Sequence, residues 1–379
     1  MSENQEALHS VVKNVNEFSA EYFKILSEEN ENKNIICSPL SASVILSMVT
    51  YGARGLTEEQ LRSGLHLSDD NTTKNGFQSL IDTLNNFKEV DLRLANKIFI
   101  ADGFAVKSEF KNTSETIFRS ASENIDFTKP VMASKTINQW CEQQTNDRIK
   151  NIVEPDDLEG AALILINAVY FKGNWAEKFD PALTKPGPFH INDTTVKEVP
   201  MMFKSGKFNF GYIEEFNVQY VELPYKNNNS EDAVSMFIML PNETSGLKNV
   251  ETNLDKINFE KLRGPAQKIH LQLPKFKIES KFDLKGVLQK MGMKEMFEST
   301  ANFKGINEST PLKVSKILQK AFIEVNEEGT EAAAVTGMQI MLMCMPLNII
   351  INRPFICVIV ANHTGTQLFN ARVIDPTLN

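Results

Sequence analysis

The chain has 379 residues, 42% of them hydrophobic and 23% charged, which is typical of a soluble protein with ample material for a large core. Its formal net charge of −8 argues against a general attraction to nucleic acid or to an anionic membrane, and no run of basic residues overrides this charge. The cysteines Cys37, Cys141, Cys344 and Cys357 are too few and too scattered for a disulfide framework, so we expect them to be reduced.

The first half of the chain has mostly helical patterns. Residues 15–26 place their apolar side chains on one helical face. Ser38 fits an N-cap with Pro39 at the first helical position, and the apolar residues that follow run almost all round, as in a buried helix. Residues 57–64 begin with a capping-box pattern and end at a glycine, and residues 132–149 are amphipathic. These patterns predict a largely helical N-terminal half.

From Leu163 onward the spacing of apolar residues changes to that of strands. The predicted strands are 163–171, 219–225, 234–241, 268–278, 347–352 and 355–362. A helix predicted over 280–293 interrupts them. No Pro/Gly/Ser-rich linker and no repeat divides the sequence, so we expect one mixed α/β (α+β) domain spanning residues 1–379.

The sequence lacks the motifs of common catalytic chemistry. It contains no G-x-S-x-G, no H-E-x-x-H and no Walker loop, and its five histidines have no metal-ligand spacing. No apolar run is both long enough and unbroken enough to span a bilayer. We therefore expect a protein that is not an enzyme, is a monomer, and has no cofactor, metal, nucleic-acid or membrane partner.

The segment GMQIMLMCMP, residues 337–346, is unusual because it holds four of the chain's 14 methionines. Together with Cys344, these methionines are soft donors that could hold Cu(I): Met338, Met341, Met343 and Met345. The metal interpretation is the weaker one, because no histidine and no second cysteine lie nearby. The alternatives are apolar packing and an exposed loop that binds a hydrophobic partner.

Five segments together resemble the serpin family, the serine protease inhibitors. They are NIICSPLSASVILSMVTYGARGLTEEQL, INAVYFKGNW, LPKFKI, KAFIEVNEEGTEAAA and INRPFICVIVANHTGTQLFNARVIDP. The resemblance covers essentially residues 10 to 376 in the family's order and spacing. It implies a serpin fold with three β-sheets, about nine helices and an exposed reactive-centre loop at about 329–348. It also implies that the main sheet can accept this loop as an extra strand.

The residues of the expected loop suit such an insertion. Alternate side chains must enter a closely packed sheet interior, so they must be small and uncharged. The positions that meet this demand are Thr330, Ala332, Ala334 and Thr336. The positions that would face outward are Glu331, Ala333 and Val335. Gly329 would provide the hinge.

Family spacing puts the scissile bond at Met343–Cys344. No Lys, Arg, Asp or Glu occurs from residue 332 to 352, which disfavours trypsin-like and caspase-like targets. Met343 suits the apolar primary pocket of a chymotrypsin-, elastase- or subtilisin-like serine protease. Cleavage one or two residues away, trapping of a cysteine protease, and a non-inhibitory serpin that acts as a carrier or chaperone remain alternatives.

The resemblance also implies two sets of supporting residues. Those of the shutter, under the region where the sheet opens, are Ser38, Ser41, Asn167 and Gln319, the last replacing the family's frequent histidine. Those of the breach, where the loop first enters the sheet, are Trp175, Lys275 and Glu327, with an ion pair expected between the last two. The family's glycosaminoglycan-binding basic patch is not evident, so no heparin site is expected.

The N-terminal sequence has no basic region followed by an apolar stretch, so no secretory signal is recognised. Together with the expected reduced cysteines, this favours a cytoplasmic protein. A secreted protein whose signal has been removed would look similar, and it remains the alternative.

Overall fold

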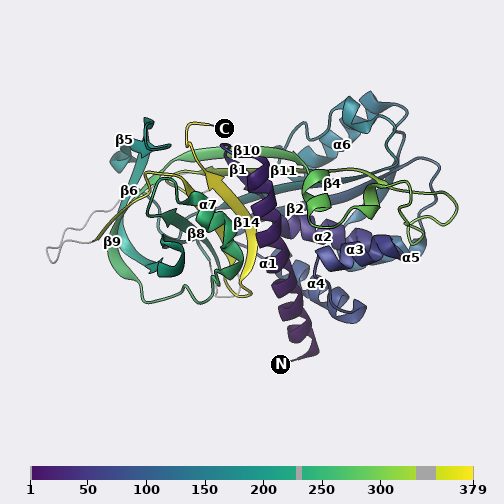
Figure 1. Ribbon diagram of the computed structural model, residues 1–379, viewed down its shortest axis with the longest axis horizontal. Coiled ribbons are helices and arrows are strands. Elements are labelled where there is room, and N and C mark those ends of the chain that lie inside the picture. Colours follow the sequence, from purple (N-terminus) through teal and green to yellow (C-terminus); the bar gives the residue numbers. More distant parts are fainter. Residues whose placement is uncertain (1, 228–232, 330–346, 379) are drawn as a thin grey trace.

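The computed structural model describes residues 2–227, 233–329 and 347–378 of the chain (Figure 1). The α-helices within these residues are α1 Glu3–Glu29, α2 Pro39–Thr50, α3 Leu56–Gly64, α4 Asp70–Asn85, α5 Ser108–Thr116, α6 Pro130–Gln144, α7 Leu247–Thr252 and α8 Lys285–Lys290. The short 3-10 helices are η1 Pro155–Leu158, η2 Pro181–Leu183, η3 Glu214–Phe216, η4 Leu254–Lys256 and η5 Glu295–Phe297. The helix count is close to the nine that the resemblance implies.

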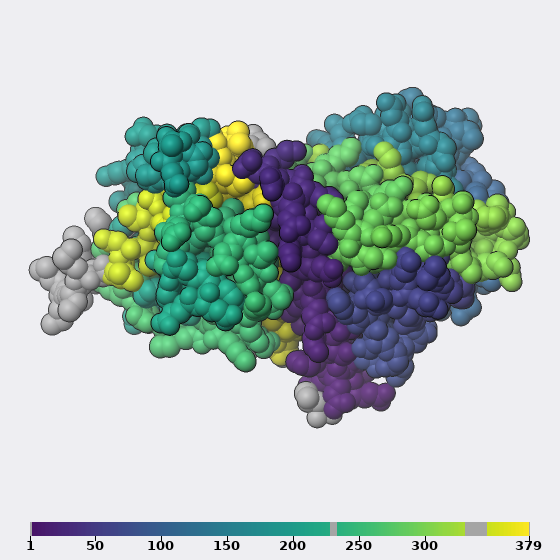
Figure 2. Space-filling view, viewed as in Figure 1, coloured from purple at the N-terminus to yellow at the C-terminus, as the bar shows by residue number. Residues whose placement is uncertain are grey.

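Helix α1 begins at a capping box, because Ser2 Oγ accepts the Gln5 N–H at 3.4 Å while Gln5 Oε1 accepts the Ser2 N–H at 3.1 Å. Its apolar face is fully buried at Val15, Phe18 and Tyr22, as the sequence predicts. Figure 2 shows α1 in purple, lying along the surface between the two ends of the elongated molecule. The helix therefore packs against both halves of the structure.

A five-stranded sheet has the strand order β10-β11-β4-β2-β3. Its strands are β10 Phe276–Asp283, β11 Val314–Val325, β4 Leu163–Gly173, β2 Val90–Ala101 and β3 Ala121–Ile125. At its centre β4 and β11 are parallel neighbours, paired from Leu163↔Val314 to Tyr170↔Phe322. We call this line of contact between β4 and β11 the seam.

The remaining strands form a nine-stranded sheet of order β1-β14-β13-β8-β7-β6-β9-β12, with β5 paired to β6. Its strands are β1 Ile35–Cys37, β5 Lys185–His190, β6 Val196–Ile213, β7 Val218–Pro224, β8 Val234–Pro241, β9 Gln267–Pro274, β12 Leu347–Ile350, β13 Phe355–Ala361 and β14 Thr366–Val373. The long strand β6 pairs with β5 and β9 through its first half and with β7 through its second half. The two halves of β6 thus connect two sets of strands, one containing β5, β9 and β12 and the other containing β7, β8, β13, β14 and β1. Together with the five-stranded sheet, these two sets match the three sheets that the sequence resemblance implies.

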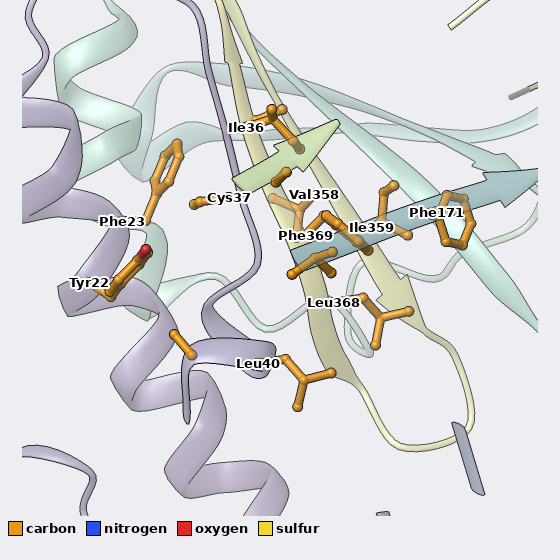
Figure 3. Close-up of a cluster of buried hydrophobic side chains, with 14 of the residues drawn as sticks. Tyr22, Phe23, Ile36, Cys37, Leu40, Phe171, Val358, Ile359, Leu368 and Phe369 are labelled. Atoms are coloured by element: carbon orange, nitrogen blue, oxygen red, sulfur yellow. The ribbon is translucent and has the colours of Figure 1, made fainter. Parts of the chain in front are cut away.

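The main core lies where α1, α2 and both sheets meet. Figure 3 shows part of this core, to which α1 contributes Tyr22 and Phe23, α2 Leu40, β14 Phe369 and β4 Phe171. The rings of Phe171 and Phe369 pack at 5.9 Å between their centroids. A second, smaller core lies between α6 and the five-stranded sheet, and it contains Ile137, Cys141, Ile164, Ile166 and Leu318. The two faces of this sheet are therefore both covered, which explains the continuous burial along β4.

The capping box predicted at the start of 57–64 is wrong, as the position of helix α3 shows. The helix begins at Leu56, so Thr57 lies inside it and has no capping role. Thr57 Oγ1 accepts the Asn302 N–H at 2.9 Å, and Gln60 Oε1 accepts the Lys294 N–H at 2.8 Å. Tertiary contacts therefore use the side chains that the local pattern assigned to a cap.

Two other predicted helices are too long. The prediction over 132–149 fails at its end, because α6 stops at Gln144 and Asn146 adopts a φ of 50°. The prediction over 280–293 fails at its start, because β10 continues to Asp283 in antiparallel pairing with β11. In both places pairing or packing with distant residues overrides the local helical pattern.

Candidate functional site

The residues predicted to act in loop insertion fall into two groups in the structure. The scissile pair Met343 and Cys344 and the loop residues 330–336 lie outside the described residues, as does the Met-rich segment considered for metal binding. Gly329, the shutter residues and the breach residues are described, and they all lie along or at one end of the seam.

A row of amide side chains crosses the middle of the seam. Asn96 of β2 is the cross-strand partner of Asn167 of β4, and Asn167 is the partner of Gln319 of β11. Gln319 Nε2 donates to Asn167 Oδ1 at 2.5 Å, and Asn167 Nδ2 donates to Asn96 Oδ1. Asn167 and Gln319 are fully buried, so this row links three strands where water cannot replace its hydrogen bonds.

The N-terminus of α2 lies directly under this row. Ser38 caps the helix by accepting the Ser41 N–H, as the sequence predicts. The Ser38 N–H also donates to Gln319 Oε1 at 3.1 Å, and Gln319 Nε2 donates to the Ser38 carbonyl at 2.9 Å. Ser41 Oγ accepts from Asn167 Nδ2 at 2.5 Å. The four shutter residues therefore belong to one buried network.

Two members of this network were missed by sequence reasoning. Tyr22 was assigned to an apolar helix face, but its hydroxyl donates to Gln319 Oε1 at 3.1 Å. Burial, with a smaller contribution from Cys37, holds the pKa of Tyr22 well above its usual value, so the hydroxyl keeps its proton. Asn96 lies in a strand that was not predicted. A buried tyrosine hydroxyl usually has a hydrogen-bond partner, so the expected burial of Tyr22 was a signal in the sequence that this residue takes part in a polar network.

The amide of Gln319 makes four hydrogen bonds in total. Its oxygen accepts from Tyr22 and Ser38, and its nitrogen donates to Ser38 and Asn167. An amide carries two donors and two acceptor positions, so this side chain is fully satisfied. Neighbouring strands lie about 4.8 Å apart, so a new strand in the seam would break the bond from Gln319 to Asn167.

The breach residues lie at the C-terminal ends of β4 and β11. Trp175 is 2% exposed, stacks on Tyr225 at 4.6 Å between ring centroids, and donates its indole N–H to the Asn326 carbonyl at 3.0 Å. The backbone N–H of Trp175 donates to the Glu328 carbonyl at 2.9 Å. This tryptophan therefore fixes the chain that leaves β11 against the chain that leaves β4.

Glu327 makes an ion pair and a hydrogen bond at this end of the seam. Its Oε2 lies 2.8 Å from Lys275 Nζ, and its Oε1 accepts from Thr184 Oγ1 at 2.7 Å. Burial alone would raise the pKa of this carboxyl, but the contacts with Lys275 and Thr184 outweigh burial and hold its pKa below the usual value. The carboxylate is therefore charged at neutral pH.

Gly329 is the last described residue before the predicted loop. Its φ is 127°, and a Cβ at this position would lie 2.2 Å from the Gly173 carbonyl oxygen and 2.7 Å from Asn174 Cα. Both the backbone conformation and the close approach to β4 therefore require glycine. The turn formed by residues 326–329 closes the end of the seam by packing directly on the end of β4.

The described residues offer neither a metal-binding cluster nor a membrane-spanning helix. Residues 2–227, 233–329 and 347–378 contain no group of three or more His, Cys, Asp or Glu side chains that could hold a metal ion. Among the helices of these same ranges, none is long and apolar enough to cross a membrane.

Comparisons with known proteins agree with this architecture. The family model described as Serpin (serine protease inhibitor) matches residues 13–376. Antichymotrypsin-2 of Bombyx mori is 36% identical over 372 residues, which cover 96% of this chain and 98% of that protein. Leukocyte elastase inhibitor of Sus scrofa is 36% identical over 372 residues, which cover 95% of this chain and 97% of that protein.

A solved structure gives the same result in three dimensions. The crystal structure of Serpin48, described as a highly specific serpin in the insect Tenebrio molitor, has a TM-score of 0.87 and 33% sequence identity, and the match covers 98% of both chains. The chain belongs to the serpin family. Its relatives support inhibition of serine proteases as its general activity.

The first prediction concerns Gln319, whose amide cannot titrate. In a Gln319→His variant, burial should lower the pKa of the new histidine below its usual value of about 6.5. The folded variant would then bind fewer protons than the unfolded chain, so its stability should fall as pH drops below about 6.5, by up to roughly 1.4 kcal/mol per pH unit. The gap between the thermal unfolding midpoints of variant and wild type should widen from pH 8 to pH 5. Gln319→Leu, which cannot titrate, should show a gap that stays constant.

The second prediction concerns the ion pair of Glu327. Because the folded-state pKa of Glu327 is depressed, its stabilising contribution is present above the unfolded value of about 4.3 and is lost as pH falls through the folded value. Lys275→Met should therefore cost about 1 kcal/mol at pH 7 and progressively less below pH 4. The comparison is made by thermal unfolding from pH 7 to pH 3. In a Glu327→Gln background the same lysine substitution should have no pH-dependent effect, and a persisting dependence would contradict this assignment.

Proposed function

We propose that the chain inhibits serine proteases with an apolar primary pocket, of the chymotrypsin, elastase or subtilisin type, and that Met343–Cys344 is the scissile bond. The observation that carries the proposal is the direct β4–β11 seam with Gly329 packed at its end. The chain that follows Gly329 therefore starts at the point where an added strand would enter. The relatives' names include an antichymotrypsin and an elastase inhibitor but also an antitrypsin, so they support a serine protease target, and the apolar class rests on Met343 and the uncharged residues around it.

The length of the loop supports insertion. Seventeen residues, 330–346, connect Gly329 to β12, and an extended chain spans about 3.3 Å per residue. The first dozen of these residues could run the full length of β4, which has 11 residues. The inward positions at 330, 332, 334 and 336 would be small, the later ones Met338 and Ile340 would be larger but uncharged, and Glu331 would face outward, so no charge would be buried.

The inhibitory reaction follows from these parts. The protease serine attacks the Met343 carbonyl, the bond to the Cys344 nitrogen breaks, and an acyl-enzyme forms. The freed loop then enters the seam and carries the protease with it before water can release the acyl group. About a dozen residues would gain sheet hydrogen bonds at about 1 kcal/mol each, on the order of 10 kcal/mol in total. The starting state is then kinetically trapped, and each molecule acts once instead of turning over as an enzyme.

In this mechanism the shutter and breach residues control the opening of the sheet and do not contact the target. The bond from Gln319 to Asn167 must break before a strand can pass the middle of the seam. The Glu327–Lys275 ion pair and the Trp175–Asn326 hydrogen bond act at the entrance. Their combined role is to delay insertion until the loop has been cleaved.

We further propose that the protein acts in a reducing compartment such as the cytoplasm. Cys37, Cys141 and Cys357 are free thiols and are buried. Burial raises the pKa of the Cys141 thiol to about 12, so it stays protonated and unreactive. A secreted protein with three inert thiols is the competing possibility. Measuring the protein in cell fractions against its culture medium distinguishes the two.

The third prediction tests the target class. The intact protein should form an SDS-stable complex with chymotrypsin or elastase, and mass spectrometry should find a released peptide that begins at Cys344. Met343→Arg should allow a complex with trypsin and slow the reaction with chymotrypsin by about 100-fold or more, because the primary pockets select opposite side chains. Met343→Leu, the matched control, should keep the chymotrypsin reaction. If every protease tried merely cleaved the loop without forming a complex, the inhibitory function would be wrong.

The fourth prediction concerns oxidation. Conversion of Met343 to its sulfoxide would place a polar group in an apolar pocket, so peroxide should slow inhibition by about 10- to 100-fold. The experiment is done in a Cys344→Ser background, which removes the neighbouring oxidisable sulfur. Met343→Leu in the same background should resist peroxide. An equal loss of rate in both variants would place the sensitive site elsewhere.

A further inference from the structure

The chain between α6 and β4 crosses the outer face of the five-stranded sheet. We call residues 145–162 the strap. At its start, Asn146 Nδ2 donates to Asp91 Oδ2 of β2 at 2.8 Å. Further along, the Lys150 carbonyl accepts from Lys320 Nζ of β11 at 2.6 Å. Since β4 lies between β2 and β11 in the sheet, the strap is fastened on both sides of the seam.

The middle of the strap packs on the same two strands. Ile152 and Val153 are buried in the smaller core, which also contains Ile166 of β4 and Leu318 of β11. The Val153 N–H donates to Asn138 Oδ1 of α6 at 3.1 Å. The strap therefore lies on the seam itself and not beside it.

Near its C-terminal end the strap contains η1, where Asp157 forms ion pairs with lysines of β11 and β10. Asp157 Oδ1 lies 2.6 Å from Lys316 Nζ of β11, and its Oδ2 lies 3.4 Å from Lys281 Nζ of β10. Its Oδ2 also accepts the Glu154 N–H at 3.0 Å. The Asp157 side chain is only 19% exposed, so solvent weakens these contacts less than those of a surface pair.

Asp157 is charged at neutral pH. Burial alone would raise its pKa, but the Glu154 N–H and the two lysines outweigh burial and hold the pKa below its usual value. Asp157 is also joined to β4, on the other side of the seam, by a short stretch of chain, because β4 begins at Leu163. One short segment is therefore joined to β4 by the chain and to β10 and β11 by ion pairs.

Opening the seam would pull these two attachments apart. Adding a strand moves β11 from about 4.8 Å to about 9.6 Å away from β4. The ion pairs of Asp157 cannot follow such a movement unless η1 leaves β4 or the pairs break. We propose that Asp157 is an ionic latch across the seam, and that its pairs with Lys316 and Lys281 set the rate at which the sheet opens. The use of this latch in inhibition rests on the function proposed above, but the latch itself does not.

Asp157→Asn is the decisive variant. The asparagine oxygen can still accept the Glu154 N–H, while both ion pairs are lost. Hydrogen exchange of the intact protein, followed by mass spectrometry, should show faster exchange of β4 and β11 amides, by roughly 5- to 30-fold at low salt. Amides of β13 and β14, which belong to the nine-stranded sheet, should exchange at the wild-type rate. Exchange of β4 and β11 at the wild-type rate in Asp157→Asn would overturn the proposal.

A matched control keeps the test specific. Lys129→Gln removes an ion pair of 2.9 Å with Asp126, which lies just before α6 and does not cross the seam. This variant should exchange like the wild type. Lys316→Gln should reproduce the effect of Asp157→Asn in part, and combining the two should add little further, because the shared pair is already lost. Full additivity would show that the two residues act independently and would contradict the latch.

Protease assays separate the latch from the proposed function. Because hydrogen exchange requires no protease, faster exchange in Asp157→Asn supports the latch even if no protease is trapped, in which case only the inhibitory function fails. If complexes form but exchange is unchanged, the function stands and the latch fails. Rising salt should speed exchange in the wild type and have little effect in Asp157→Asn. A salt response that is equal in both proteins would also contradict the latch.

Discussion

The direct pairing of β4 with β11 is the constraint on which the rest of the structure depends. These strands are parallel neighbours at the centre of a sheet that is covered on both faces. A central parallel pair is usually the most stable part of a fold, because both of its faces are buried. Here the same pair carries buried amides in its middle and ion pairs at both ends, so its stability depends on polar and charged contacts as well as on apolar packing.

In the mechanism proposed above, the seam must stay closed and then open completely. Hydrogen bonds suit this behaviour, because they weaken steeply once donor and acceptor separate or lose their alignment. Each such bond contributes only about 1 kcal/mol net, so no single one holds the sheet closed. The Gln319–Asn167 and Trp175–Asn326 bonds both join the two sides of the seam, so they resist small displacements and are lost within one strand width. The Asp157 ion pairs also cross the seam, but their attraction falls more gradually with distance.

Part of this arrangement could be predicted from the sequence. The N-cap at Ser38 and the buried helix α2 follow from local patterns. The family resemblance predicted that Ser41, Asn167 and Gln319 lie close together. Strand β2 was missed because the surrounding chain has helical patterns, and its partner Asn96 was missed with it. The contacts of Asp157 with Lys281 and Lys316 join residues more than 120 positions apart, so no local pattern could have indicated them.

The placement of neutral and charged groups along the seam follows from burial. In the middle, where Gln319 and Asn167 are fully buried, the contacts are between uncharged amides. At the ends, the lysines keep partial access to water, with 38% of the Lys275 side chain and 34% of the Lys281 side chain exposed. A histidine in the middle could become charged there, and an unpaired buried charge costs several kcal/mol. With glutamine at position 319, no side chain of the Gln319–Asn167–Asn96 row can gain a charge, so we expect pH to leave the middle of the seam unchanged across the neutral range.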